Sequence, residues 1–153
     1  MKRIEVKLAL PVVAPLLDVV KDLSGGLHES LAAPLGLPDL DPEFRDEWNA
    51  ELLATQSSDI ETLLGLFNEE FFREGVIALD EANAEPIVRA CAALRLRLRA
   101  SRLKALADDT LESSEVDITT LDEPVRHAFL CYLFLATLQE LVIQHLDSSI
   151  LDS

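Results

Sequence analysis

Three arginines, Arg95, Arg99 and Arg102, have the type and spacing to form a binding site. They fall at positions i, i+4 and i+7 of a predicted helix, so their guanidinium groups share one helix face. Such a face could bind a phosphate or another anion, or dock an acidic partner. Alternatively, the arginines pair with Asp and Glu side chains of neighbouring helices in the same chain, with their stems packed on the core. We favour intramolecular pairing, because acidic residues outnumber basic ones by 28 to 13.

Glu140 is the acidic residue that could act with these arginines. Thr137, Glu140 and Gln144 are spaced at i, i+3 and i+7, and this forms a polar stripe on an otherwise apolar helix. A buried pair between Glu140 and one of the arginines would fix helix register more than it would stabilise the fold. A pocket of Arg95, Glu140 and a histidine could instead bind or hydrolyse a small molecule. That hypothesis requires the side chains to converge in a deep cleft.

The histidines and cysteines give little support to catalysis or metal binding. We expect His28, His127 and His145 in structural or solvated positions, and Cys91 and Cys131 as reduced, buried thiols of a cytoplasmic protein. Two cysteines without a neighbouring histidine do not make a zinc site. No G-x-S-x-G, H-E-x-x-H, P-loop or G-x-G-x-x-G pattern occurs. The sequence therefore predicts no cofactor and favours a protein that is not an enzyme.

Several of these residues, among them Glu140 and Cys131, belong to the helix predicted over residues 122–146, and the rest of the chain must be arranged around this helix. Between residues 128 and 138 the only polar residue is Thr137, and a helix apolar on all sides must be surrounded by protein or lipid. This apolar run is well short of the roughly 20 residues needed to cross a bilayer, so we expect protein around it. A capping-box pattern, Thr120 to Glu123, predicts its start.

The remaining elements are predicted from hydrophobic periodicity and breaker residues. Two short apolar runs, residues 4–10 and 75–79, should pair as a small β ribbon covered by helices. Further helices are predicted over residues 13–23, from residue 42 to an interruption at 57–59, from there to 74, and from 80 or 83 to 106. The first of these helices is predicted to stop at Ser24-Gly25-Gly26 and the third at Gly75. The second is predicted to begin with Asp41 as its cap and Pro42 at its first position.

Three of these helices have a predicted apolar face. The faces are Phe44, Trp48 and Leu52 in the second helix; Ile60, Leu63, Leu64, Phe67 and Phe71 in the third; and Ile87, Cys91, Leu94 and Leu98 in the fourth. The fold class is mainly α: about five helices packed around a buried C-terminal helix, with a two-stranded ribbon. We expect one domain over residues 1–153, with an acidic loop at 108–122 and a fraying tail at 147–153.

Charge and hydropathy exclude some partners. Hydrophobic residues make up 49% of the chain and the mean hydropathy is +0.19, yet the net charge is −15. So apolar a chain needs a large core and an interface, whereas its negative charge opposes binding to nucleic acid or to an anionic membrane. The charge is uneven, since Asp39–Glu74 holds 11 acidic and 2 basic residues whereas Gly75–Ala107 holds 3 acidic and 6 basic.

Several short runs occur in an order that resembles a known family. They are Asp41-Pro-Glu-Phe-Arg45, Val76-Ile-Ala-Leu-Asp80, Leu94-Arg-Leu, Arg102-Leu, Tyr132-Leu and Leu138-Gln-Glu-Leu141. Together they are similar to the uncharacterised, mostly actinobacterial family catalogued as domain of unknown function two thousand and seventeen, from the first strand to Leu146. The chain departs from the pattern in having Phe134-Leu135-Ala136 where a Gly-Trp pair is expected.

The resemblance implies no particular activity, because members lack an assigned one. Such proteins are commonly encoded near the adaptor of the Clp protease, which implies a role around regulated proteolysis by association only. If the family pattern marks a site, that site would be Arg45, Arg95, Gln139 and Glu140.

The leading functional hypothesis is a non-enzymatic interaction or regulatory protein that binds itself, as a homodimer, or another protein. The alternative is a small-molecule-binding or hydrolytic helical protein with an Arg/Glu/His pocket. We expect neither nucleic acid nor a membrane as partner. The candidate interaction or buried polar residues are Arg45, Arg95, Arg99, Arg102, Gln139 and Glu140.

Overall fold

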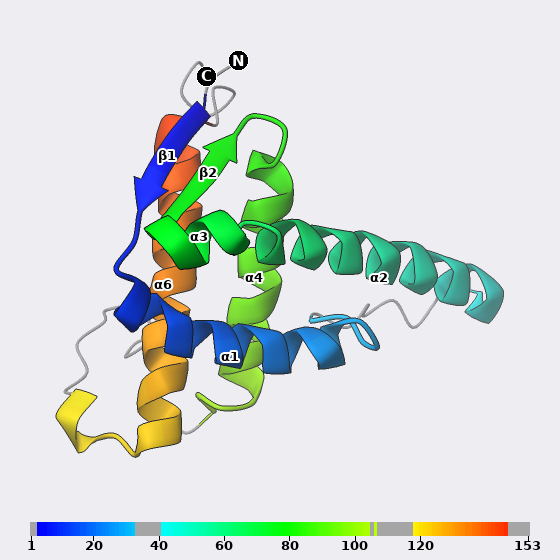
Figure 1. Cartoon of the computed structure of the whole chain (residues 1–153). Helices are drawn as coiled ribbons and strands as arrows, with labels where there is room; N and C mark the ends of the chain where they lie inside the picture. Colours follow the sequence, from blue (N-terminus) through cyan, green and yellow to red (C-terminus); the bar gives the residue numbers. More distant parts are fainter. Residues whose placement is uncertain (1–2, 33–40, 105, 107–117, 147–153) are drawn as a thin grey trace.

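The fold is a helical bundle with a small β ribbon at one end (Figure 1). The computed structural model describes residues 3–32, 41–104, 106 and 118–146. In chain order the elements are β1 (Arg3–Lys7), α1 (Leu10–Leu27), α2 (Pro42–Leu64), α3 (Glu69–Glu74), β2 (Val76–Asp80), α4 (Ala84–Ala100), the 3-10 turn η1 (Ile118–Thr120) and α6 (Glu123–His145). The predicted fold class is confirmed. The count of about five helices is slightly high, because in the described ranges one of the helices, α3, has only 6 residues.

Helix α6 is the central element, as predicted. It packs against α4 along its length, and α1 crosses both helices (Figure 1). Its buried side chains are Ala128, Phe129, Cys131, Tyr132, Leu135, Leu138 and Val142. Leu133 and Phe134 are half-buried against the same core, so the helix is enclosed more completely on one side than on the other.

By length and composition alone, α6 could also cross a membrane. The core helix of a soluble protein passes the same test, since both are long and apolar. In this fold 39% of the apolar window of α6 is buried by the rest of the chain.

The ribbon forms as predicted, although its first strand is shorter. β1 and β2 pair antiparallel, with Glu5 opposite Ala78, and the inward-facing Ile77 and Leu79 of β2 are buried. β1 ends at Lys7 rather than residue 10, because Leu10 already begins α1. Gly75 ends α3 in the left-handed region at φ 73°, where a Cβ atom would lie 2.8 Å from the Leu8 carbonyl oxygen. The predicted stop at Gly75 is confirmed.

Helix α1 is longer than predicted at both ends. It runs through Ser24, Gly25 and Gly26, which were expected to stop it, and Pro15 lies inside it rather than in its first turn. Burial of Leu27 stabilises the added turn. Its terminal carbonyl groups are also satisfied from another helix, because Gln56 Nε2 of α2 donates to the Leu27 carbonyl oxygen at 2.6 Å.

Helix α2 begins where predicted but is not interrupted at residues 57–59. Asp41 accepts a hydrogen bond from the Glu43 backbone N–H at 3.1 Å, which confirms the predicted cap. The expected break is absent because Asp59 faces the core and binds Arg89 of α4 instead of capping a new helix. The chain breaks later, at Gly65, and Asn68 then caps α3 by accepting from the Phe71 N–H at 3.1 Å.

Helix α4 supplies much of the core, and its predicted stripe is confirmed. Ile87, Cys91, Leu94 and Leu98 are all fully buried. Cys91 and Cys131 are free thiols, as expected, and burial raises the pKa of each to about 12. The helix ends at Ala100, earlier than predicted.

Three other expectations fall near or outside the described ranges. Asp122, and not a capping box from Thr120, is the N-cap of α6, and its side chain makes no capping hydrogen bond. Most of the expected acidic loop at residues 108–122 and the tail at 147–153 lie outside the described residues.

Candidate functional site

The predicted arginine face of α4 is directed at neighbouring helices. Arg102 Nη2 is 3.0 Å from Asp22 Oδ2 of α1, an intramolecular ion pair of the kind expected. The guanidinium carbon of Arg99 lies 5.7 Å from the centroid of the Tyr132 ring of α6. Arg97 donates to Ser30 Oγ at 2.9 Å. The half-buried arginines therefore connect α4 to α1 and α6.

Arg95 has the closest set of contacts with α6. Its Nη1 donates to Gln139 Oε1 at 2.7 Å and its Nη2 to the Tyr132 hydroxyl at 3.1 Å. Its guanidinium carbon lies 4.5 Å from the Tyr132 ring centroid, which places the cation on the aromatic face. Gln139 Nε2 in turn donates to the Val88 carbonyl oxygen of α4 at 3.0 Å. These contacts fix the register of α4 against α6.

Glu140 is not the partner of Arg95. It is exposed, and its Oε1 accepts from Gln144 Nε2 at 3.0 Å. Arg95, Gln139 and Glu140 do line one open hollow of about 420 Å³, together with Ala136, Ile143 and Gln144. None of the three histidines is among the residues that line it. The hollow therefore lacks the histidine that the hydrolytic alternative requires beside Arg95 and Glu140.

Arg45 lies apart from the other predicted site residues. It is in the first turns of α2, and this end of the helix projects away from α4 and α6 (Figure 1). Of the six predicted residues, the structure brings together Arg95, Gln139 and Glu140, with Arg99 beside the same tyrosine. Arg102 faces α1 and Arg45 is on a different surface.

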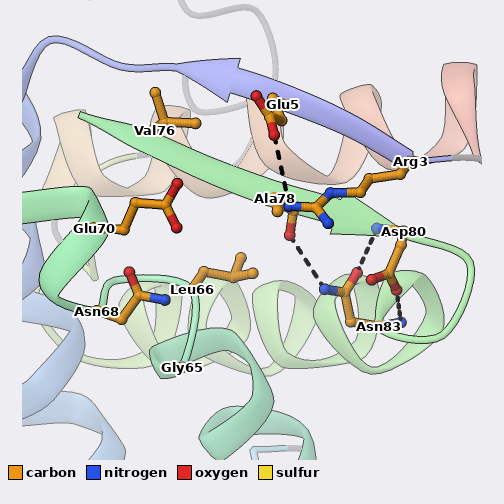
Figure 2. A pocket seen from close by; sticks show the side chains of 10 residues that line it. All are labelled: Arg3, Glu5, Gly65, Leu66, Asn68, Glu70, Val76, Ala78, Asp80 and Asn83. Atoms are coloured by element: carbon orange, nitrogen blue, oxygen red, sulfur yellow. Dashed lines mark hydrogen bonds and ion pairs between the residues drawn. The ribbon is translucent and has the colours of Figure 1, made fainter. Parts of the chain in front are cut away.

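A smaller pocket, of about 230 Å³, lies on the outer face of the ribbon (Figure 2). Arg3 and Glu5 of β1 form one wall, with 3.6 Å between Arg3 Nη2 and Glu5 Oε1. Glu70 of α3 points into the pocket from the other side, near Val76.

The polar groups at the end of this pocket stabilise the turn between β2 and α4. Asp80 Oδ1 accepts from the backbone N–H groups of Ala82 and Asn83, each at 2.9 Å. Asn83 Oδ1 accepts from the Asp80 N–H at 2.9 Å, and its Nδ2 donates to the Ala78 carbonyl oxygen at 3.3 Å (Figure 2). Within the described ranges, no three His, Cys, Asp or Glu side chains form a group that could hold a metal ion. The polar residues Asp80 and Asn83 at this end of the pocket therefore have a structural role in the turn.

The most unusual surface is on the projecting part of α2. Phe44, Trp48 and Leu52 are 65%, 49% and 36% exposed and follow one another at intervals of four residues, so they share one helix face. We call these three side chains the α2 face. The other large exposed hydrophobic side chains in the described part of the chain, Val12, Phe72 and Leu96, are on three different helices. A contiguous exposed apolar patch marks an interaction site more often than isolated apolar residues do.

Acidic side chains lie at the N-terminal end of the α2 face and along one of its borders. Asp41, Glu47 and Glu51 are exposed there, whereas the exposed Glu43 and Asp46 lie on the opposite side of the helix. Glu51 lies in line with the face, since it follows Phe44 by seven residues and Trp48 by three. Arg45 is the one basic residue in this segment and lies three residues before Trp48, on the other border. The surface is therefore apolar at its centre and mainly negative at its rim, a common arrangement at protein interfaces.

Sequence reasoning missed two features of these sites. Phe44, Trp48 and Leu52 are predicted as the apolar face of their helix, but their exposure is not, although Glu51 within the same stripe indicates contact with water. The ion pair between Asp59 and Arg89, with hydrogen bonds of 2.9 and 3.0 Å, was also missed, because its partners are 30 residues apart. This hydrogen bonding raises the pKa of Arg89, so the guanidinium stays charged.

Comparison with known proteins adds a family but no activity. No curated protein and no solved structure matches the chain significantly. Residues 28–146 match the family described as a domain of unknown function, DUF2017. This range includes the α2 face and helices α4 and α6, which carry Arg95 and its contacts. The resemblance predicted from the order of short motifs is thus confirmed, and the chain belongs to the DUF2017 family.

Proposed function

We propose that this protein is a non-enzymatic interaction or regulatory protein that binds another protein through the α2 face. The observation that carries the proposal is the exposure of Phe44, Trp48 and Leu52 on a helix end that projects from the bundle. Exposing three large apolar side chains to water costs free energy unless a partner buries them. Tryptophan is also enriched among the residues that dominate binding energy at interfaces.

Site-specific photo-crosslinking in the native host tests this function. A benzophenone amino acid at position 44 should capture a distinct protein, which mass spectrometry would identify. The matched control carries the same group at Phe72, another exposed phenylalanine, on α3. Capture at position 44 should disappear with Trp48→Ser in the same chain. Identical products from positions 44 and 72, or capture that ignores Trp48→Ser, would refute binding through the α2 face.

We further propose that the partner acts in regulated proteolysis, which rests on the family resemblance alone. Proteins crosslinked at position 44 should then include a protease component, its adaptor or a substrate. Capture of a partner from an unrelated process would contradict the role in regulated proteolysis but would leave the proposed interaction function standing.

Self-association is a separate part of the proposal. The apolar side chains available for it outside the α2 face include Val12 and Phe72. Light scattering after size exclusion at micromolar concentration measures it directly. A mass of about 34 kDa, twice the 16.9 kDa of one chain, would support a homodimer, and a strict monomer would remove it.

The small-molecule-binding alternative has less support. Arg95 already donates to Gln139 and Tyr132, and Glu140 already accepts from Gln144, so these polar groups have partners within the chain. A ligand would have to displace these contacts, which costs free energy.

A further inference from the structure

We propose that the partner of the α2 face is a basic amphipathic helix. This inference rests on the proposed function and specifies the chemistry of the partner. It follows from the shape of the surface and from the charges at its rim.

The shape of the α2 face suits a helix. Phe44, Trp48 and Leu52 form one row along about two turns of an exposed helix. A second helix can lay its own apolar row against such a row, with anchors at i, i+3 or i+4, and i+7. The partner therefore needs large apolar side chains at helical spacing.

The rim selects the charge of the partner. Three exposed carboxylates, on Asp41, Glu47 and Glu51, accompany the face, and Arg45 is the only basic residue in this segment. Lysine or arginine residues flanking the apolar row of the partner would be attracted to this rim, whereas acidic residues would be repelled. The net charge of −15 on the whole chain extends the attraction to longer range.

The same charges oppose a second copy of this chain as the occupant. In an antiparallel two-fold dimer the border of each α2 face that carries Glu47 and Glu51 would meet its own image, so these residues would approach like charges. A different, basic protein does not incur this repulsion.

The test uses the fluorescence of Trp48, the only tryptophan in the chain. Three peptides without Trp or Tyr are titrated into the full-length protein: an amphipathic helix of leucine and lysine, the same helix with glutamate for lysine, and a scrambled lysine peptide. We expect the first to shift the emission of Trp48 to shorter wavelength and to bind at least about tenfold more tightly than the other two. Its affinity should fall as salt is raised to 1 M.

Two pairs of variants locate the binding. Glu47→Gln/Glu51→Gln should weaken the lysine peptide by about three- to tenfold, whereas Glu61→Gln/Glu81→Gln, which removes two other exposed charges, should leave it within about twofold. Phe44→Ser should weaken it by more than about tenfold and Phe72→Ser should not. Circular dichroism confirms that each variant is folded.

Each other outcome overturns a specific claim. Equal binding of the lysine and glutamate peptides, or no binding of either, would overturn the basic partner while crosslinking at position 44 would still support the interaction function. A shift of Trp48 emission to shorter wavelength as the protein alone is concentrated would identify a second copy as the occupant and overturn the inference. Insensitivity to Phe44→Ser in both the peptide and crosslinking experiments would overturn the inference and the proposed function together.

Discussion

The two halves of α2 have similar apolar spacing but opposite environments. In the second half Ile60 and Leu63 are fully buried, and Asp59 is 5% exposed. In the first half Phe44 and Trp48 are 65% and 49% exposed. The second half packs on α4, whereas the first projects beyond it (Figure 1).

Specific polar contacts divide the halves. Gln56 binds the end of α1 through three hydrogen bonds: to the carbonyl oxygens of Leu27 and Ser30, and from the Ala32 N–H. Asp59 then binds Arg89 of α4. After Gln56, α2 is thus held by side chains of other helices. An apolar stripe predicts burial, but it does not say whether the same chain or a partner provides it.

The largest effect that distinguishes the halves should come from Ile60→Ala. Ile60 is 0% exposed, so its truncation leaves a cavity and should lower the free energy of unfolding by about 2–5 kcal/mol. The matched change Leu52→Ala in the projecting half should cost about 0.5 kcal/mol or less. Urea unfolding measures both. Equal losses would show that the two halves are packed alike.

A smaller loss is expected when the link between α2 and α4 is broken. Asp59→Ala should lower the free energy of unfolding by about 2 kcal/mol, because it removes two charge-assisted hydrogen bonds to Arg89. Because Arg89 is about half exposed, water partly compensates it. A double-mutant cycle with Arg89→Ala isolates the pair. A coupling energy near zero would mean that the ion pair does not anchor α2.

The thiols distinguish the core from the projecting half. Burial raises the pKa of Cys91 and Cys131 to about 12, so both should resist iodoacetamide in the folded protein, whereas a cysteine introduced by Trp48→Cys should react. Between pH 9 and 12 the unfolded state loses thiol protons that the folded state retains. The free energy of unfolding should therefore fall as pH rises, by up to about 1.4 kcal/mol per pH unit for each thiol.

Replacing a thiol provides the control for this pH dependence. Cys91→Ala should show a shallower loss of stability above pH 9 than the unchanged chain, because one titrating group is absent. Other groups titrate alike in both proteins, so the difference between the two curves isolates the thiol. Parallel curves would contradict the burial of Cys91.

Locally encoded parts of the fold were predictable from the sequence. The stripe from Ile87 to Leu98, the cap at Asp41 and the glycine at position 75 each depend on residues within a few positions of one another. Two of the wrong helix boundaries, Ser24–Gly26 and Ser57–Asp59, are sites where distant side chains override local propensity. Gln56 satisfies the extended end of α1, and Arg89 binds the aspartate that would otherwise favour a helix start.

The candidate site was only partly predictable for the same reason. Sequence spacing placed Arg95 and Arg99 on one face, but the choice of Tyr132 and Gln139 over Glu140 as the contacts of Arg95 depends on how α4 and α6 pack. Periodicity identified Phe44, Trp48 and Leu52 as one face. Whether these side chains are exposed depends on how far the other helices extend along α2. A local sequence pattern does not contain this information.

The smallest expected effect is also the most discriminating for the α2 face. Phe44→Ser should change the free energy of unfolding by about 0.5 kcal/mol or less, because this side chain is 65% exposed and loses few contacts. The same substitution at the fully buried Phe129 of α6 should prevent stable folding or cost at least about 3 kcal/mol. Thermal and urea unfolding of the two variants measure the contrast. A large loss at position 44 would mean that the α2 face stabilises this chain itself, and its exposure could then no longer be explained by a partner.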